Sequence, residues 1–205
     1  MSLFNSPEIR EDYENSYRQY GAGPKALLWW DYRSMGVRFH ELMKDVPVEG
    51  KTIMDAGCGM GDLLPYLYAK STDFKYLGVD NTASFIDIAK KRYEGHDFKL
   101  GDPFGGRIGM FDVVLSSGVM NGNVAGWLKK REKMIAKLWE QTGEVLSFNM
   151  AGGLKPAKDD SLIAYADAQV IFEFCKTLTP RAILRSHYLK NDFTVVMFKK
   201  SFYEG

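Results

Sequence analysis

The stretch that most constrains the fold is Asp55–Gly61, with the sequence Asp-Ala-Gly-Cys-Gly-Met-Gly, which directly follows the apolar segment 52–54. Glycines between a strand and a helix allow a tight turn and let the backbone approach a ligand closely. The helix that follows offers free N–H groups to a polar or negatively charged group. The spacing is Asp-x-Gly-x-Gly-x-Gly rather than Gly-x-Gly-x-x-Gly. Asp55 would repel a pyrophosphate, so the turn is predicted to bind a cationic or hydroxyl-bearing ligand.

From Lys51 onward, short apolar segments alternate with segments whose apolar residues recur at helical spacing. Alternating strands and helices indicate an α/β fold with a mostly parallel sheet covered on both faces. The last two strands are separated by four residues, which indicates an antiparallel hairpin. The predicted strands are 52–54, 74–79, 98–100, 111–115, 144–148, 182–188 and 193–198, and the predicted helices are 62–70, 82–93, 125–141 and 168–178.

Two segments outside this alternation are expected to border the ligand. Apolar residues at helical spacing predict one amphipathic helix from Ala26 to Met43, after the helix-breaking segment Gly21–Pro24. An aromatic and cationic cluster surrounds this helix and consists of Tyr20, Trp29, Trp30 and Arg33. The cluster favours either a lid over the ligand or a helix packed on the sheet edge. The stretch 147–156 is polar and predicts a flexible loop at the substrate entrance.

A second acid strengthens the prediction from the glycine turn. Asp80 ends the second predicted strand, nineteen residues past Gly61, roughly the spacing at which an acid binds ribose hydroxyls. A glycine turn alone is weak evidence for a nucleotide site, whereas a glycine turn with acids ending two successive strands is stronger. The alternative is a cluster of turn glycines with two surface acids.

The residues from Ile53 to Leu64 resemble the first motif of the class I S-adenosylmethionine-dependent methyltransferases, and the resemblance extends over about 51–148. It continues through Leu77–Asp80, Gly101–Phe104 and Phe111–Leu115. The resemblance implies a Rossmann-like, doubly wound, mostly parallel seven-stranded sheet with a C-terminal antiparallel hairpin strand. It also implies one domain over residues 1–205, with an N-terminal helical lid at 1–45 and a cofactor-binding core at 51–205. The segments 20–30 and 117–121 resemble bacterial and phage members of undefined substrate.

This resemblance implies S-adenosyl-L-methionine as cofactor and S-adenosyl-L-homocysteine as product. The lid hypothesis adds Trp30 against the sulfonium and Arg33 or Arg38 on a carboxylate. The family resemblance places Asp55, Gly57 and Gly59 at the methionine part of the cofactor and Asp80 at the ribose hydroxyls. It places Asn81 and Phe85 near the ribose and adenine, and Asp102 with Pro103 or Phe104 at the adenine. Around the methyl-transfer site it places Ser116, Ser117 and Gly118.

No residue pattern identifies a catalytic group. Methyl transfer from a sulfonium needs in-line alignment and exclusion of water, and a base only where the nucleophile must lose a proton. The hairpin region can border the substrate, so His187 and Tyr188 are the catalytic candidates to test first. Cys58 is either a reactive thiol near a helix N-terminus or, as its small size favours, a packing residue.

Composition limits the partners. The net charge of +1 provides no general attraction for nucleic acid or an anionic membrane, and the basic run 129–133 suits a solvated helix face. Apolar runs are too short to span a bilayer, and the chain does not open on a signal-peptide pattern. Two cysteines form neither a disulfide framework nor a zinc site, which favours a reducing cytoplasm and no metal. We therefore expect a cytoplasmic enzyme with a small-molecule acceptor.

Three alternatives remain open from the sequence. A nicotinamide-dependent oxidoreductase would fit Asp80, but it does not fit Asp55 or the closing hairpin. A binding module could keep the cofactor site without turnover. An RNA or protein methyltransferase is a further possibility, although the chain lacks both an Asp-Pro-Pro-Tyr-like motif and a Pro-Cys nucleophile after the fourth strand, and its charge is near neutral. The methyl-accepting atom and the oligomeric state stay open.

Overall fold

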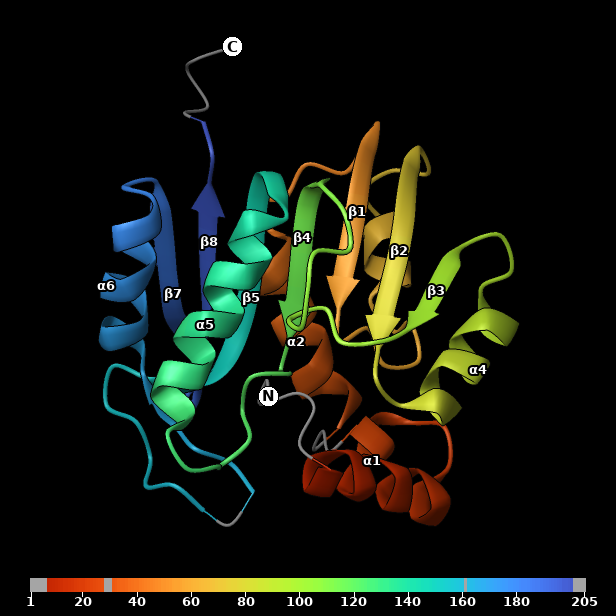
Figure 1. The fold of residues 1–205 in the computed structure, drawn as a ribbon, viewed down its shortest axis with the longest axis horizontal. Coiled ribbons are helices and arrows are strands. Elements are labelled where there is room, and N and C mark those ends of the chain that lie inside the picture. Colours follow the sequence, from red (N-terminus) through yellow and green to blue (C-terminus); the bar gives the residue numbers. More distant parts are fainter. Residues whose placement is uncertain (1–6, 28–30, 161, 201–205) are drawn as a thin grey trace.

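The structure is a computed structural model that describes residues 7–27, 31–160 and 162–200. Its strands lie in one sheet, in the order β3-β2-β1-β4-β5-β8-β7, and a short strand β6 pairs with the end of β5 (Figure 1). The elements in chain order are α1 (Pro7–Tyr20), the 3-10 turn η2 (Pro24–Leu27), α2 (Tyr32–Met43), β1 (Lys51–Ala56), α3 (Leu64–Tyr68), β2 (Phe74–Asp80), α4 (Ala83–Arg92), β3 (Asp97–Leu100), β4 (Phe111–Ser117), α5 (Trp127–Glu140), β5 (Thr142–Gly153), β6 (Ala166–Asp167), α6 (Ala168–Leu178), β7 (Ala182–Leu189) and β8 (Asp192–Phe198).

The sheet confirms the predicted α/β architecture. Strands β1 to β5 are parallel neighbours, whereas β8 runs antiparallel between β5 and β7. Seven strands in a mostly parallel sheet with an antiparallel C-terminal hairpin are as predicted, and β6 adds a two-residue strand. All the parallel strands end at the same edge of the sheet, which is the lower edge in Figure 1.

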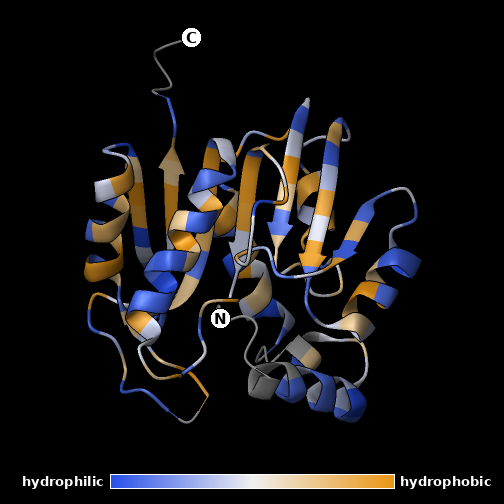
Figure 2. Cartoon of the chain, viewed as in Figure 1, coloured by the Kyte–Doolittle hydropathy of each residue, from blue (hydrophilic) through white to orange (hydrophobic). Residues whose placement is uncertain are grey.

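Helices cover both faces of the sheet, and the strands carry apolar side chains on both sides. In β1 the side chains alternate, so Ile53 packs with residues of α2, α3 and α4, while Met54 packs with residues of α5 and α6. Both side chains are completely buried. Figure 2 shows hydrophobic residues along the central strands and mostly hydrophilic residues in the coloured part of α1.

The prediction of a flexible loop at 147–156 is wrong for residues 147–153. Strand β5 continues to Gly153, and its residues from Val145 onward are buried. Its polar side chains find partners inside the protein: the Ser147 hydroxyl donates to the carbonyl of Leu42 at 2.7 Å, and the Asn149 amide oxygen accepts from the Gly118 N–H at 2.9 Å. These hydrogen bonds offset the cost of burying polar groups, so the polar composition does not mark a loop here.

The N-terminal region also differs from the prediction of one helix over 26–43. Residues Pro24–Leu27 form the short 3-10 turn η2, and helix α2 begins only at Tyr32. Asp31 caps α2, because its carboxylate accepts from the Ser34 N–H at 2.7 Å. The predicted residues Trp29 and Trp30 lie outside the described part of the chain.

Helix α1 lies across the carboxyl edge of the sheet, below β1 and β2 in Figure 1. The rings of Tyr13 and Tyr17 meet the ring of Phe85 edge-on, with centroids 6.0 and 6.1 Å apart. The Ser84 hydroxyl donates to the Glu14 carboxylate at 3.1 Å, which adds a polar contact. The N-terminal segment therefore covers the edge at which the predicted site residues gather. Within the described residues, no helix is long and apolar enough to cross a membrane.

Candidate active site

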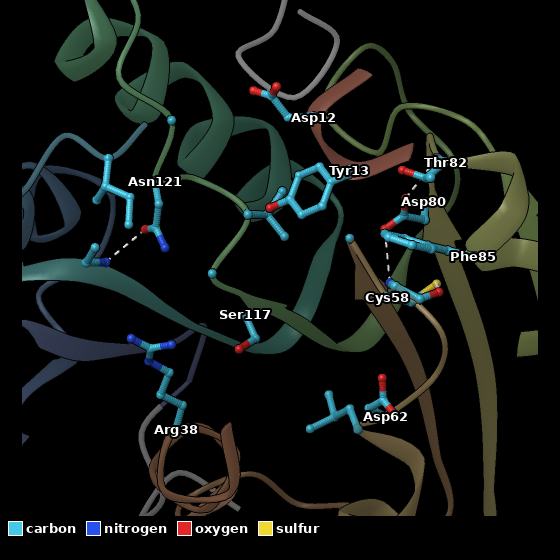
Figure 3. Close-up of a pocket in the computed structure, with 18 of the residues that line it drawn as sticks. Asp12, Tyr13, Arg38, Cys58, Asp62, Asp80, Thr82, Phe85, Ser117 and Asn121 are labelled. Carbon is cyan, nitrogen blue, oxygen red and sulfur yellow. Dashed lines mark hydrogen bonds between the residues drawn. The ribbon is translucent and has the colours of Figure 1, made fainter. Parts of the chain in front are cut away.

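A cavity of about 1000 Å³ opens at this carboxyl edge, between the sheet and the N-terminal segment. Its size is at the upper end of small-ligand pockets, so it has room for more than one small molecule. Figure 3 shows acidic residues from the turn after β1 and from the end of β2 on one side and a wall of other segments on the opposite side, with Tyr13 between them. Among the labelled residues, Asp62, Asp80 and Thr82 lie on the first side, and Arg38, Ser117 and Asn121 lie on the second.

The glycine turn forms the floor of the first side. Gly57, Gly59 and Gly61 have φ values of +81°, +53° and +82°, a region that residues with a Cβ rarely adopt. The Gly57 and Cys58 N–H groups both donate to the carbonyl of Val79, at 2.8 and 3.1 Å. A Cβ on Gly57 would lie 2.1 Å from a methyl carbon of Val119, so only glycine fits there. The turn thus needs its glycines for conformation and for close packing.

Two buried carboxylates flank this turn. Asp80 accepts from the Gly59 N–H at 3.0 Å and from the Thr82 N–H at 2.9 Å, so it holds the turn next to the start of α4. Asp55 accepts from the Tyr76 hydroxyl at 2.9 Å. Burial raises the pKa of Asp55 to about 7, because the hydrogen bond from Tyr76 only partly offsets desolvation. Burial also raises the pKa of Asp80.

Cys58 lines the cavity, but its thiol has the properties of a packing residue rather than of a nucleophile. It is buried, and burial together with Asp80 and Asp55 raises the pKa of its thiol well above the ordinary value. A thiol that stays protonated is a poor nucleophile. This supports the packing interpretation over the reactive one.

We expect iodoacetamide at pH 8 to leave both cysteines of the native protein unmodified. Burial raises the pKa of Cys58 and raises that of Cys175 to about 12, so neither presents a thiolate. Mass spectrometry of native and urea-unfolded samples checks this, with both residues modified at least about 10-fold faster after unfolding. Fast modification of native Cys58 would contradict the packing role.

The structure brings one group of predicted site residues to the cavity. These residues come from the ends of β1 and β2, the start of α4 and the end of β4, and their proposed ligand contacts stay predictions. They are Asp55, Gly57, Gly59, Asp80, Asn81, Phe85, Ser117 and Gly118.

A second group lies outside the described lining. Ser116 is completely buried, and its hydroxyl donates to the Ala56 carbonyl at 2.9 Å, which ties β4 to β1. Asp102 accepts from the Phe104 N–H at 2.9 Å, and Phe104 packs in the core with residues of α5. The Pro103 carbonyl accepts from the Gln141 side chain at 3.0 Å. The adenine contacts expected of Asp102, Pro103 and Phe104 stay predictions.

The catalytic candidates and Arg33 are also absent from the described cavity lining. Arg33 is exposed on α2, whereas Arg38, farther along α2, does line the cavity. The His187 side chain is 65% exposed and lies 4.0 Å from the Glu41 carboxylate. The Tyr188 hydroxyl donates to Asp192 at 2.8 Å, and burial raises the Tyr188 pKa. Neither member of the pair is among the described residues that line the cavity, and their catalytic role stays a prediction.

Among the other cavity residues, Arg38 is the alternative to Arg33 in the lid hypothesis, whereas no pattern in the sequence assigns a site role to Tyr13, Asn121 or Tyr165. Tyr13 belongs to α1, and burial near Asp80 raises its pKa to about 12, so its hydroxyl is neutral. Arg38 forms an ion pair with Asp192, whose pKa burial raises to about 6. Asn121 and Tyr165 come from two loops that are far apart in the sequence. Only the fold brings these four side chains to one cavity.

A family model described as a methyltransferase domain matches residues 47–190. A Mycobacterium tuberculosis protein, provisionally named as a methyltransferase, is 28% identical over 161 residues, which cover 73% of this chain and 94% of that protein. The magnesium protoporphyrin IX methyltransferase of Synechocystis PCC 6803, crystallised with bound S-adenosylhomocysteine, matches with a TM-score of 0.64 at 17% identity, covering 96% of each chain. The plantazolicin methyltransferase in complex with S-adenosylhomocysteine matches with a TM-score of 0.59 at 15% identity, covering 97% of this chain and 92% of that one.

The fold and the acid-flanked glycine turn define a Rossmann-like α/β methyltransferase, as predicted from the sequence. Because the family model covers well over half of its length, the chain belongs to the methyltransferase domain family. This confirms the resemblance to the class I S-adenosylmethionine-dependent methyltransferases. The match to the two solved structures is evidence for the shared fold.

Proposed function

We propose that the cavity binds S-adenosylmethionine beside the glycine turn and that the protein transfers its methyl group to a small molecule bound at the opposite wall. The observation that carries this proposal is the position of Asp55 and Asp80. They end two adjacent parallel strands, flank a left-handed glycine turn, and face the same cavity. This pairs a site for ribose hydroxyls with a carboxylate for a cationic group.

The donor side fits such a cofactor. Each carboxylate oxygen of Asp80 accepts one backbone N–H, and its remaining lone pairs can accept ribose hydroxyls. Asp55 and Gly57 both line the cavity, and because Gly57 has no side chain the turn packs directly against Val119, which also lines the cavity. Phe85 offers an apolar surface for a ring, and Asn81 offers amide groups beside it.

The chain itself contributes positioning and exclusion of water. When bound, S-adenosylmethionine supplies an activated methyl group on a sulfonium. Helix α1 covers the cavity through Tyr13 and so limits access of water to the reacting groups. The Cys58 thiol stays protonated, and the described lining contains no histidine. Alignment rather than a histidine or thiolate base is therefore the contribution that these residues make.

A small acceptor suits the charge and the enclosure of the cavity. The described lining has four carboxylates, Asp12, Asp55, Asp62 and Asp80, against two cations, Lys25 and Arg38. A nucleic-acid acceptor would need a basic groove for its phosphates. The site lies under α1, and the proposed lid of the single domain is residues 1–45. Such a covered site suits an acceptor that is small enough to fit entirely inside the cavity.

The experiment that tests the acceptor class is an assay of S-adenosylhomocysteine release. The protein is incubated with S-adenosylmethionine and separate panels of small molecules, total RNA and unfolded protein. We expect turnover with members of the small-molecule panel and none with the other two. Turnover on RNA or protein alone would contradict the small-molecule acceptor, and binding without turnover on any panel would favour a non-catalytic binding module.

Asp55 makes the affinity for the cofactor depend on pH. Its pKa is raised from 3.8 to about 7, so its contribution to folding stability is present below about pH 4 and lost as pH rises through 7. A cationic ligand favours the carboxylate, so binding releases a proton. We expect the Kd for S-adenosylmethionine to rise as pH falls below 7, by up to about 10-fold per pH unit. Asp62 and Asp80 contribute negative charge nearby.

Calorimetric titrations between pH 5.5 and 8.5 measure this dependence, at about one-unit steps. Asp55→Asn is the matched control, because it keeps the size of the side chain and removes its titration. We expect the variant to bind weakly at every pH with a flat profile. An equally steep profile in Asp55→Asn would assign the dependence to another group.

A further inference from the structure

Arg131 of α5 is a charged side chain that is completely buried. Burial lowers its pKa to about 10, so the guanidinium stays protonated at neutral pH. Burying a cation without a paired anion is costly. Among the described residues, no carboxylate lies within ion-pair distance of Arg131. An apolar side chain would fill the same space at lower cost, so the arginine requires another explanation.

Its hydrogen bonds provide that explanation. Nη2 donates to the Asn121 carbonyl at 3.1 Å and to the Ala164 carbonyl at 2.6 Å. The guanidinium carbon lies 4.2 Å from the centroid of the Trp127 ring, which partly compensates the charge. Nε and Nη1 have no hydrogen-bond partner. One buried cation therefore joins two backbone carbonyls that are 43 residues apart in the sequence.

Those carbonyls belong to two loops that form one wall of the cavity. The first loop follows β4, and the second joins β5 to β6. They pair directly as well, because the Ala164 N–H donates to the Asn121 carbonyl at 2.9 Å, and Gly122 and Ile163 form an antiparallel bridge. The wall residues that line the cavity are Val119, Asn121, Gly122, Leu162, Ile163 and Tyr165. Figure 3 shows Asn121 across the cavity from Asp80.

We infer that Arg131 is a positioning residue for the methyl acceptor: it holds the two-loop wall, and Asn121 in particular, against the donor side. This inference rests on the proposed methyl transfer. The Asn121 amide oxygen accepts from the Ala151 N–H at 2.8 Å, so side chain and backbone of this residue are both fixed. Arg131 itself lies outside the described cavity lining and acts through Asn121. A shift of about 1 Å in a positioning group lowers rates by up to about 100-fold.

The test compares Arg131→Met with Arg131→Lys and with Lys129→Met, a charge nearer the solvent on the same helix. Hydrogen–deuterium exchange reports on the wall at residues 119–123 and 162–165. Calorimetry with S-adenosylhomocysteine reports on the donor side. Steady-state kinetics with an acceptor from the small-molecule panel separate the KM of the acceptor from the KM of the donor.

For Arg131→Met we expect exchange in both loops to rise about 10-fold or more, with the donor Kd within about twofold of the native protein. The KM of the acceptor should rise about 10-fold or more, and the KM of the donor should stay unchanged. Arg131→Lys keeps a positively charged hydrogen-bond donor, so its loop exchange and its acceptor KM should lie between those of Arg131→Met and the native protein. This variant provides the test if Arg131→Met does not fold. Lys129→Met should match the native protein.

Two results would overturn this role. Unchanged exchange in the wall would show that Arg131 does not hold it, and a parallel loss of donor binding, acceptor KM and overall stability would show a general structural role. Failure of the native protein to bind S-adenosylhomocysteine would reject the proposed function instead. In that case the exchange pattern would still report on the contact between Arg131 and the wall.

Discussion

Asp80→Ala is expected to weaken the binding of S-adenosylhomocysteine by about 10- to 100-fold. The variant loses a charged acceptor for the ribose hydroxyls, and hydrogen bonds to charged groups contribute roughly 1.5–3 kcal/mol. It also leaves the Gly59 and Thr82 N–H groups without the carboxylate that fixes the turn. Calorimetric titration measures the affinity, and thermal unfolding of the same sample separates a lost contact from a lost fold.

Asp102→Ala is the matched control for this variant. Asp102 also caps a turn after a strand, and the family resemblance assigns it to the adenine, but it lies outside the described cavity lining. The structure leads us to expect a change in affinity of less than about threefold. An equal loss in both variants would contradict this view of the site and favour the adenine contact.

Gly57→Ala is expected to cause the largest loss among substitutions in the turn. A Cβ there would overlap Val119, with 2.1 Å between carbon atoms, and the backbone φ of +81° is unfavourable for alanine. The unfavourable φ alone costs about 1–2 kcal/mol, and the overlap adds about 1–3 kcal/mol of overpacking. We expect a fall in unfolding free energy of about 2–5 kcal/mol together with loss of cofactor binding. Urea unfolding measures the first and calorimetry the second.

Two further variants separate strain from crowding. Gly95 has a φ of +95°, but no atom lies within 4 Å of the position that a Cβ would occupy, so Gly95→Ala carries only the backbone cost. It should lose about 1 kcal/mol and bind the cofactor normally. Adding Val119→Ala to Gly57→Ala should recover part of the lost stability. No difference between Gly57→Ala and Gly95→Ala would show that the packing of the turn is unimportant.

The fold could be predicted where the pattern is local. Strands β1, β2 and β4 are buried on both faces, so their apolar runs identify them directly. The part of β5 beyond residue 148 could not be recognised, because Asn149 is polar and its partners come from α2 and from Gly118, directly after β4. Helix α1 could not be recognised either, since its contact with the core depends on a few aromatic rings around Phe85 rather than on an apolar stripe.

The candidate site likewise has one part that the sequence predicts and one part that only the fold brings together. The glycine turn and Asp80 are close in sequence and occupy fixed places in a strand–turn–helix unit, so spacing indicated them. The opposite wall combines Arg38, Asn121 and Tyr165 from three distant segments. Of these three, only Arg38 has a site role predicted from the sequence, through the lid hypothesis, and no local pattern assigns one to Asn121 or Tyr165. The hairpin places His187 on an exposed edge strand, which the sequence could not distinguish from a position in the cavity. The cytoplasmic location predicted from the two cysteines stays a prediction.

The most direct test of the central claim is a calorimetric titration of the native protein with S-adenosylhomocysteine at pH 8, where Asp55 is ionised. We expect one site per chain with a Kd between about 1 μM and 1 mM, and competition by S-adenosylmethionine. Reduced nicotinamide dinucleotide should not bind, because Asp55 opposes a pyrophosphate at the turn. Absence of binding at millimolar S-adenosylhomocysteine, or tighter binding of the nicotinamide, would contradict the assignment of this cavity to a methyl donor.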